Sequence, residues 1–282
     1  MLHTRHKIAL ARAAYKVIRG ARSIVGKPST GVFRRRGIRW SLDLAEGIDF
    51  SIYLLGAFEP RTVNAYQRFI KLGDTVLDIG ANIGAHTLFF AKFVGDGGRV
   101  FGFEPTEWAF RKLRANLALN PELERRVDAN HMFLVASDTD SRPPEIYSSW
   151  PLEERGNLHP KHLGQLQETG SAGAATLDSF LAARPDVEPR WIKIDVDGNE
   201  LPVLRGAEGT LRRLKPGIIM ELSPYTTREA GHEFADLVEL LANCGYSFAE
   251  LESGRPLSSD AAALEALVPD GASLNVLLTA GT

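Results

Sequence analysis

The sequence predicts an α/β protein built on a doubly wound, mostly parallel sheet of seven strands. Three observations support this fold class. The composition, 282 residues with 44% hydrophobic and 24% charged, is typical of a globular protein with one full-sized domain and an appendage. From residue 71 onward, short apolar runs alternate with segments of helical period. The first run, VLDIG at residues 76–80, passes through a glycine turn into a second apolar segment.

Residues 1–56 form the predicted appendage, a basic helix followed by a β-hairpin. Residues 1–42 carry 11 Lys and Arg and no acid, whereas the rest of the chain carries 22 Lys and Arg against 35 Asp and Glu. Apolar residues at helical spacing between Ile8 and Val25 predict a helix, and the alternation around Gly37 predicts the hairpin. We expect the helix either to contact an anionic membrane peripherally or to pack on the acidic domain or on a partner subunit of a homo-oligomer.

Residues 57–282 form the predicted main domain. Its strands are expected near residues 74–79, 98–103, 131–136, 190–195, 217–222, 245–250 and 273–279. Residues 141–175, rich in Pro, Gly and Ser, predict an insertion or a substrate lid. In a doubly wound sheet, ligands bind beyond the carboxyl ends of the strands, near the point where the strand order reverses. Four of the predicted strands end on acids, namely Asp78, Glu104, Asp195 and Glu221.

Composition and charge exclude several classes of function. The only cysteine, Cys244, cannot form an internal disulfide framework or a zinc site of paired cysteines. No apolar run reaches the roughly 18 residues of a membrane helix, and Arg12 and Lys16 interrupt the first apolar stretch, unlike a signal peptide. We therefore expect a cytoplasmic protein. Because the chain beyond residue 42 is acidic, it would repel a phosphate backbone, and no nucleic-acid partner is predicted.

The turn GANIG at residues 80–84 indicates the class of cofactor. Backbone N–H groups at such a strand-to-helix turn are expected to face a ligand, which Gly80 and Gly84 allow to approach. A dinucleotide site has a glycine where this turn has Asn82, so pyrophosphate is disfavoured. The carboxylate of Asp78 suits an ammonium group, and Glu104, which ends the next strand, suits two ribose hydroxyls. S-adenosylmethionine carries these groups and no phosphate, and it is the predicted cofactor.

Four longer segments extend this pattern. They are FEPRTVNAYQRFIKLGDTVLDIGANIGAHTLFFAKFVGDGGRVFGFEP, LRANLALNP, ATLDSF and WIKIDVDGNELPVLRGAEGTLRRLKPGIIMEL, and they span most of residues 57–222. Together they resemble the FkbM-type S-adenosylmethionine-dependent methyltransferases. The resemblance implies a Rossmann-like class I methyltransferase core. It also implies transfer of a methyl group to a hydroxyl of a small-molecule or glycan acceptor, often a sugar or a natural product.

The cofactor site is assigned from these motifs. Ser137 and Asp138 follow the third predicted strand, where an adenine edge would lie, although an ordinary turn is the alternative. For Asp78 and Glu104 the structural alternatives are a helix cap and a solvated loop acid. The predicted cofactor-binding residues are Glu59, Asp78, Gly80, Asn82, Gly84, Glu104, Pro105, Ser137, Asp138 and Asp195.

The stretch WIKIDVDGNE at residues 191–200 is expected to carry the catalysis. Lys193, Asp195 and Asp197 alternate along it and fall on one face of a strand. One interpretation pairs Lys193 with Asp195 structurally. The other, which we prefer, places Asp195 beside the transferred methyl group and the incoming hydroxyl. The resembling family often has a histidine in a DVEGHE-like motif, where this chain has Asn199, so a histidine base is not expected there.

A base or a metal ion must handle the proton of the acceptor hydroxyl. His159 and His162 become candidate bases if the insertion folds over the site. The predicted catalytic residues are Asp195, Lys193 and His159. Magnesium held by Asp195, Asp197 and Glu221 is an alternative that we do not favour, and no metal ligand is assigned. For the function as a whole, the alternatives are a nucleotide-dependent oxidoreductase of similar fold and a non-catalytic adaptor.

Overall fold

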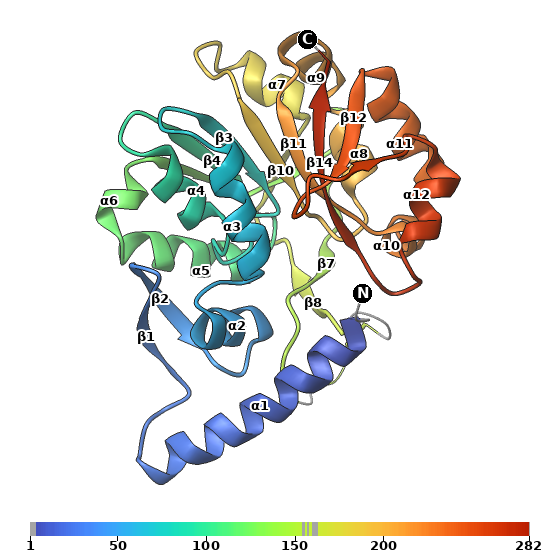
Figure 1. Cartoon of the computed structure of the whole chain (residues 1–282). Coiled ribbons are helices and arrows are strands. Elements are labelled where there is room, and N and C mark those ends of the chain that lie inside the picture. The colour runs from blue at the N-terminus through green and yellow to red at the C-terminus, as the bar shows by residue number, and fades with distance from the viewer. Residues whose placement is uncertain (1–3, 154–155, 157, 160–162, 282) are drawn as a thin grey trace.

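A mostly parallel sheet of eight strands forms the centre of the computed structural model, which describes residues 4–153, 156, 158–159 and 163–281 (Figure 1). In spatial order the strands are β13 (Pro256–Leu257), β12 (Tyr246–Glu250), β14 (Leu274–Ala280), β11 (Gly217–Leu222), β10 (Trp191–Ile194), β3 (Thr75–Ile79), β4 (Arg99–Phe103) and β5 (Val127–Asn130). Strands β11, β10, β3, β4 and β5 are parallel, and β14 is antiparallel to both of its neighbours. The predicted fold class is confirmed.

Two details of the sheet differ from the sequence prediction. The two-residue β13 adds an eighth strand at one edge. At the opposite edge, the strand predicted over residues 131–136 is present but does not join the central sheet, because the sheet uses the more polar β5. The apolar run that follows it forms β6 (Met132–Leu134), which leaves the sheet and pairs with β9 (Gly173–Ala175).

Helices cover both faces of the sheet, and each strand divides its apolar side chains between them. Val76 and Val100 pack into the core on one face, whereas Leu77 and Phe101 pack into the core on the other. The first face carries α2 (Gly47–Leu55), α3 (Pro60–Phe69), α4 (Thr87–Val94), α5 (Glu107–Ala118) and α6 (Pro121–Glu124). The second carries α7 (Leu177–Ala182), α8 (Glu200–Arg205), α9 (Glu208–Leu214), α11 (Phe234–Asn243) and α12 (Ala261–Leu267), and α10 (Pro224–Glu229) follows β11. This is the doubly wound arrangement that the sequence predicts.

The N-terminal region contains the predicted helix and hairpin. Helix α1 (Thr4–Ile24) crosses beneath α2, and its side chains Ile8 and Tyr15 are buried (Figure 1). Strands β1 (Thr30–Arg35) and β2 (Ile38–Asp43) pair antiparallel around a turn in which Arg36 and Gly37 have positive φ. Both elements that the spacing of apolar residues predicted are confirmed.

The N-terminal region and the main domain share one core. Trp40 of β2 and Phe50 of α2 are buried in the same cluster as Phe89 of α4. In addition, the backbone N–H of Ser41 donates to the side-chain oxygen of Asn116 in α5, and that of Arg39 donates to the side-chain oxygen of Asn120, just before α6. Residues 29–56 are thus an integral layer of the fold rather than a mobile attachment.

The described residues of the segment 141–175 lie between α1 and the carboxyl edge of the sheet (Figure 1). It contains the hairpin of β7 (Glu145–Ser148) and β8 (Gln165–Glu168). The Asn82 amide donates to the hydroxyl of Ser148 (3.1 Å), and the hydroxyl of Tyr15 donates to Glu153 (2.7 Å). The segment therefore bridges α1 and the glycine turn, while its role as a substrate lid stays a prediction.

Candidate active site

The glycine turn of residues 80–84 lies at the carboxyl edge of β3, where the strand order reverses between β3 and β10. Gly80 and Gly84 have φ values of +81° and +88°, which other residues rarely adopt. A Cβ on Gly80 would lie 1.9 Å from the carbonyl oxygen of Asp195, and one on Gly84 would lie 2.5 Å from Leu88 Cδ1. Gly80 is thus required by a backbone contact inside the protein, whereas at Gly84 the positive φ is the main reason for a glycine.

The backbone N–H groups of residues 80–84 are all bonded within the chain. Two of them donate to the carbonyl oxygen of Phe103 (3.0 and 2.9 Å), and that of Asn82 donates to Glu104 Oε2 (2.8 Å). The N–H of Ile83 donates to the side-chain oxygen of Asn82, and that of Gly84 donates to the carbonyl of Ala81, both at 2.9 Å. The expectation that these N–H groups face a ligand is wrong, because the adjacent strand β4 and the turn itself supply their acceptors.

Asp78 is fully buried at the end of β3. The hydroxyl of Thr87 donates to its Oδ2 (2.6 Å), and its Oδ1 lies 3.5 Å from the ammonium of Lys193. Burial raises the pKa of Asp78, and the nearby ammonium opposes that rise. Its assignment as a direct ligand of the cofactor ammonium stays a prediction, and its observed partners are Thr87 and Lys193.

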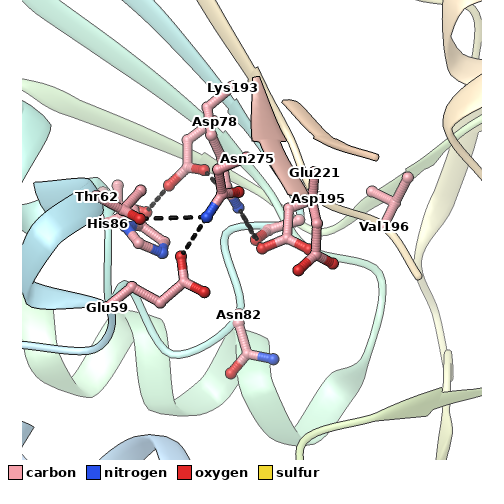
Figure 2. Close-up of polar contacts among 12 residues, drawn as sticks. Glu59, Thr62, Asp78, Asn82, His86, Lys193, Asp195, Val196, Glu221 and Asn275 are labelled. Atoms are coloured by element: carbon pink, nitrogen blue, oxygen red, sulfur yellow. Dashed lines mark hydrogen bonds and ion pairs between the residues drawn. The ribbon is translucent and has the colours of Figure 1, made fainter. Parts of the chain in front are cut away.

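Lys193 joins two acids from adjacent strands. Its Nζ lies 3.3 Å from Asp195 Oδ2 as well as 3.5 Å from Asp78, and it donates to the carbonyl of Gly80 at 3.2 Å (Figure 2). Burial lowers the pKa of Lys193, but the carboxylates of Asp195 and Asp78 outweigh burial and hold it above the ordinary value. The lysine is therefore charged. The ion pair of the structural interpretation is present, while the preferred role of Asp195 beside the transferred methyl group stays a prediction.

Three carboxyl side chains surround a small cavity beside this lysine. They belong to Glu59 at the start of α3, Asp195 after β10 and Glu221 in β11, and Asp195 is 31% exposed (Figure 2). Burial raises the pKa of Glu221 well above its ordinary value, and Asp195 and Glu59 add to the rise. The remaining lining residues are Tyr66, His86, Lys193, Ile194, Ile219, Met220 and Asn275.

Glu59 is held in place by residues that the sequence analysis did not identify. Asn275 of β14 donates its amide to Glu59 Oε2 (3.1 Å) and also to the hydroxyl of Thr62 (3.2 Å), as Figure 2 shows. Glu59 has a φ of +47°, an uncommon backbone conformation for a residue other than glycine. The available signal for Asn275 was its position as a polar residue within the apolar run LNVLL.

His86 and Tyr66 form a buried pair on another wall of the cavity. The Tyr66 hydroxyl and His86 Nδ1 are 3.1 Å apart in a hydrogen bond. Burial lowers the pKa of His86 to about 3, and the neighbouring Lys193 adds to the decrease. His86 is therefore neutral at physiological pH. His86 could not be predicted from the sequence because a single histidine at a helix start has no distinctive spacing.

Glu104 supports the glycine turn. Besides the N–H of Asn82, its carboxylate accepts hydrogen bonds from the N–H (2.8 Å) and the hydroxyl (2.5 Å) of Thr106. An ionised carboxylate has about four acceptor positions, so one remains for the predicted ribose hydroxyl. The carbonyl of Pro105 accepts a hydrogen bond from His131 Nε2 (3.0 Å). The cofactor roles of Glu104, Asn82 and Pro105 stay predictions.

Ser137 and Asp138 are exposed and bonded locally. Asp138 accepts hydrogen bonds from the N–H of Thr176 (2.8 Å) and from the hydroxyl of Ser179, both at the start of α7. The hydroxyl of Ser137 lies 2.9 Å from that of Thr139. These contacts are those of an ordinary turn, the alternative considered for Ser137 and Asp138. Binding of the adenine by these two residues stays a prediction.

His159 lies in the 141–175 segment, apart from the acids around the cavity. Its Nε2 lies 3.4 Å from Glu229 Oε2, and its ring packs edge-on against that of Tyr147. Neither partner lines the cavity. The structure thus does not join His159 to Lys193 and Asp195, and its catalytic role stays a prediction. The other candidate, His162, lies outside the described residues.

The acids considered for magnesium do not form a metal-binding group. Asp197 has left the strand, with a φ of +49° in the turn after β10, and its side chain is exposed. Among the residues that the structure describes, no three His, Cys, Asp or Glu side chains are placed so as to hold a metal ion. Independence of metal ions remains a prediction about the reaction.

The FkbM methyltransferase domain model matches residues 78–248, which include the glycine turn, Lys193, Asp195 and Glu221. The chain belongs to this family. This FkbM-family chain is similar to 31-O-demethyl-FK506 methyltransferase FkbM of Streptomyces tacrolimicus, with 31% identity over 49% of this chain and 61% of the relative. It is also similar to the hexuronic acid methyltransferase AglP of Haloferax volcanii, with 25% identity over 62% of this chain and 64% of the relative. The chain thus matches less than two thirds of the length of these curated relatives.

A solved structure of methyltransferase FkbM from Methylobacillus flagellatus is 18% identical, with a TM-score of 0.43 over 73% of this chain and 43% of that one. No helix in the described part of the FkbM-family chain is both long enough and apolar enough to span a membrane.

Proposed function

We propose that this FkbM-family chain is an S-adenosylmethionine-dependent O-methyltransferase that acts on a hydroxyl of a sugar, glycan or natural product. The observation that carries the proposal is the charge around the cavity at the carboxyl edge. Glu59, Asp195 and Glu221 line it, and the only described Lys or Arg among its lining residues is Lys193. S-adenosylmethionine has a positive sulfonium and a positive ammonium and no phosphate, so an acidic cavity favours it electrostatically.

The hydrogen bonds of the glycine turn argue against the oxidoreductase alternative. A pyrophosphate is bound by backbone N–H groups that are free to point at it. In residues 80–84 every N–H already donates to an acceptor within the chain. Binding a dinucleotide in the usual manner would require these bonds to be broken.

The charges and polar groups of the residues present suit those of the proposed cofactor. The carboxylate of Glu59 faces the cavity and would hold the ammonium group, and Glu104 retains an acceptor position for the ribose. When bound, the cofactor supplies an activated methyl group. Asp195, with a partly exposed carboxylate, accepts the proton of the acceptor hydroxyl, and Lys193 orients that carboxylate. Holding the hydroxyl in line is the main remaining task, and such positioning can contribute roughly 7–11 kcal/mol.

The class of acceptor is supported by the names of the two relatives, one of which refers to 31-O-demethyl-FK506 and the other to hexuronic acid. A natural product and a sugar acid both present hydroxyl groups. The adaptor alternative is disfavoured by the arrangement of the site. Lys193 and the two acids paired with it form a buried charged cluster beside the cavity, and such a cluster is costly to bury. A binding module would not need it.

Calorimetry with S-adenosylhomocysteine and with NADH tests the cofactor. We expect binding of S-adenosylhomocysteine alone. Glu59→Gln should weaken it about tenfold, as is typical for loss of a charge-assisted contact, and Glu252→Gln, which alters an exposed acid, should not.

Mass spectrometry of candidate acceptors incubated with labelled S-adenosylmethionine, before and after EDTA treatment, tests the transfer. Tight binding of NADH, or no labelled product from any sugar or natural product, would contradict the proposal, and loss of transfer on EDTA treatment would contradict independence of metal ions.

A further inference from the structure

Helix α1 has two opposite faces, and only one of them packs on the protein. Ile8 and Tyr15 are buried, with exposed fractions of 2% and 3%. Leu10, Val17 and Ile24 are 71%, 73% and 86% exposed. Because an α-helix turns about 100° per residue, the seven-residue spacing places these three on one stripe. Leu10 and Val17 each follow a buried residue by two positions, so the stripe lies nearly opposite the packed face.

Exposed large apolar side chains are concentrated around this helix. Of the eleven in the described part of the chain, seven lie within residues 1–56. Single exposed apolar residues need no explanation, but a contiguous stripe of large ones on a globular protein marks an interaction surface. The stripe formed by Leu10, Val17 and Ile24 is therefore the strongest candidate for a contact that the fold itself does not use.

Cations border the apolar stripe. The sequence of α1 contains six Lys and Arg and no acid, and the first acid in the chain is Asp43. Lys16 on the helix and Lys27 just beyond it are exposed. An amphipathic helix with an apolar stripe, a basic polar face and low overall hydrophobicity typically lies in the plane of a membrane interface. Anionic lipids attract such a segment within about a Debye length.

The same charges oppose pairing of α1 with a second copy of itself. Two such helices would bring together the exposed Lys16 and Lys27 of each copy, and α1 itself has no acid to pair with them. Like charges in an interface are unfavourable, whereas an anionic bilayer neutralises them while it buries the stripe.

We propose that α1 binds the surface of an anionic membrane, with Leu10, Val17 and Ile24 inserted among the lipids and the flanking lysines at the headgroups. The inference concerns a surface separate from the cavity at the carboxyl edge, and it does not depend on the proposed function. It extends only to peripheral contact, because α1 is not apolar enough to span a bilayer.

Co-sedimentation of the full chain with vesicles tests this proposal. We expect the protein to pellet with vesicles of phosphatidylcholine and phosphatidylglycerol, less so at high salt, and not with phosphatidylcholine alone. Replacing Leu10, Val17 and Ile24 together by Gln should lower the partition coefficient by about tenfold or more, given the apolar area removed. Lys16→Glu combined with Lys27→Glu should also lower it. The matched control is Leu72→Gln, which changes an 80% exposed leucine outside the helix and should leave binding unchanged.

Each replaced side chain is exposed, so melting temperatures of the variants should match that of the original chain. Equal sedimentation of the triple variant and the Leu72→Gln control would overturn the proposal, as would absence of binding to anionic vesicles. Light scattering supplies a further check. A dimer that the triple variant converts to monomers would identify the stripe as a subunit interface and would also overturn the membrane assignment.

Discussion

Lys193 controls the charge balance of the site. It is the cation shared by Asp78, which is fully buried, and Asp195, which is partly exposed. Removing one member of a buried ion pair leaves an uncompensated charge, which is typically far more destabilising than removing a partly solvated one. The two acids should therefore differ in function. We expect Asp78 to fix Lys193 within the fold and Asp195 to act on the substrate.

Asp195→Asn is expected to keep the fold and to lower the rate of methyl transfer by at least about tenfold, because the amide cannot accept a proton. Lys193→Met should instead destabilise the protein by about 3–5 kcal/mol, because it leaves Asp78 buried without its cation. The measurement combines urea denaturation with single-turnover methylation for both variants. An unstable Asp195→Asn that turns over normally in the molecules that remain folded would assign this acid a structural role only.

Glu200, a buried residue beside the site, should make stability depend on pH. Burial raises its pKa to about 7, although the N–H groups of Val196 and Gly198, each 3.3 Å from Oε1, favour the ionised form. In the unfolded chain the carboxyl titrates near 4.5. Between these two values the folded state holds a proton that the unfolded state has lost, so stability falls as pH rises through this window.

Glu200→Gln retains an acceptor oxygen and removes this titration. The variant should therefore gain stability relative to the original chain as pH rises from 4.5 to 7, with the difference constant above that range. Urea midpoints of both proteins across this range provide the measurement, and Glu188→Gln, at an exposed position, is the control. Parallel curves for the original chain and Glu200→Gln would show that the carboxyl titrates normally in the fold.

At the scale of elements, the sequence predicted the positions of most strands of the sheet and two of the acids that follow them. The alternation of apolar runs located β3, β4, β10, β11, β12 and β14, and the acids Asp195 and Glu221 do meet at the carboxyl edge. Strand β5 was missed because its sequence VDAN lacks an apolar run and lies at a sheet edge with no strand beyond it. Asn275 and Thr62 were missed because they meet across 213 residues of chain, a contact that no local pattern reports.

The glycine turn shows a similar limit. The motif predicted a close approach at Gly80, but it suggested that a ligand approaches, whereas the atom nearest to an added Cβ is the carbonyl oxygen of Asp195. Gly80→Ala should therefore be strongly destabilising because it combines backbone strain with this clash. Gly73→Ala is the control, since Gly73 has a φ of +88° and no atom within 4 Å of a Cβ. It should cost only the backbone strain of about 1–2 kcal/mol.

Urea denaturation of the two variants separates these effects. We expect Gly80→Ala to lose clearly more free energy of unfolding than Gly73→Ala, and to weaken S-adenosylhomocysteine binding because the end of β10 must shift. Equal losses in both variants would show that the carbonyl of Asp195 moves aside at little cost, and that the close approach of β3 and β10 is not a requirement of the fold.

At the scale of the whole molecule, the N-terminal region consists of two parts with different roles. Six side chains between residues 38 and 52 are almost fully buried in the core shared with α4 and α5, and they are Ile38, Trp40, Leu42, Leu44, Phe50 and Ile52. At about 1.5–3 kcal/mol each, their burial is comparable to the total stability of about 5–15 kcal/mol of a typical protein. Among the described side chains of helix α1, the almost fully buried apolar ones are Ile8 and Tyr15.

Two truncated chains test this division. A chain that begins at residue 29 lacks α1 and should unfold cooperatively at a lower urea concentration, because the loss of Ile8 and Tyr15 removes about 3–6 kcal/mol of apolar burial. It should also lose the proposed binding to anionic vesicles. A chain that begins at residue 57 exposes Phe89 and leaves Asn116 and Asn120 without the backbone of β2, so it should show no cooperative transition. If this shorter chain instead unfolds cooperatively at the same urea midpoint as the full chain, residues 57–282 fold independently of the N-terminal region. The shared core would then contribute little to stability.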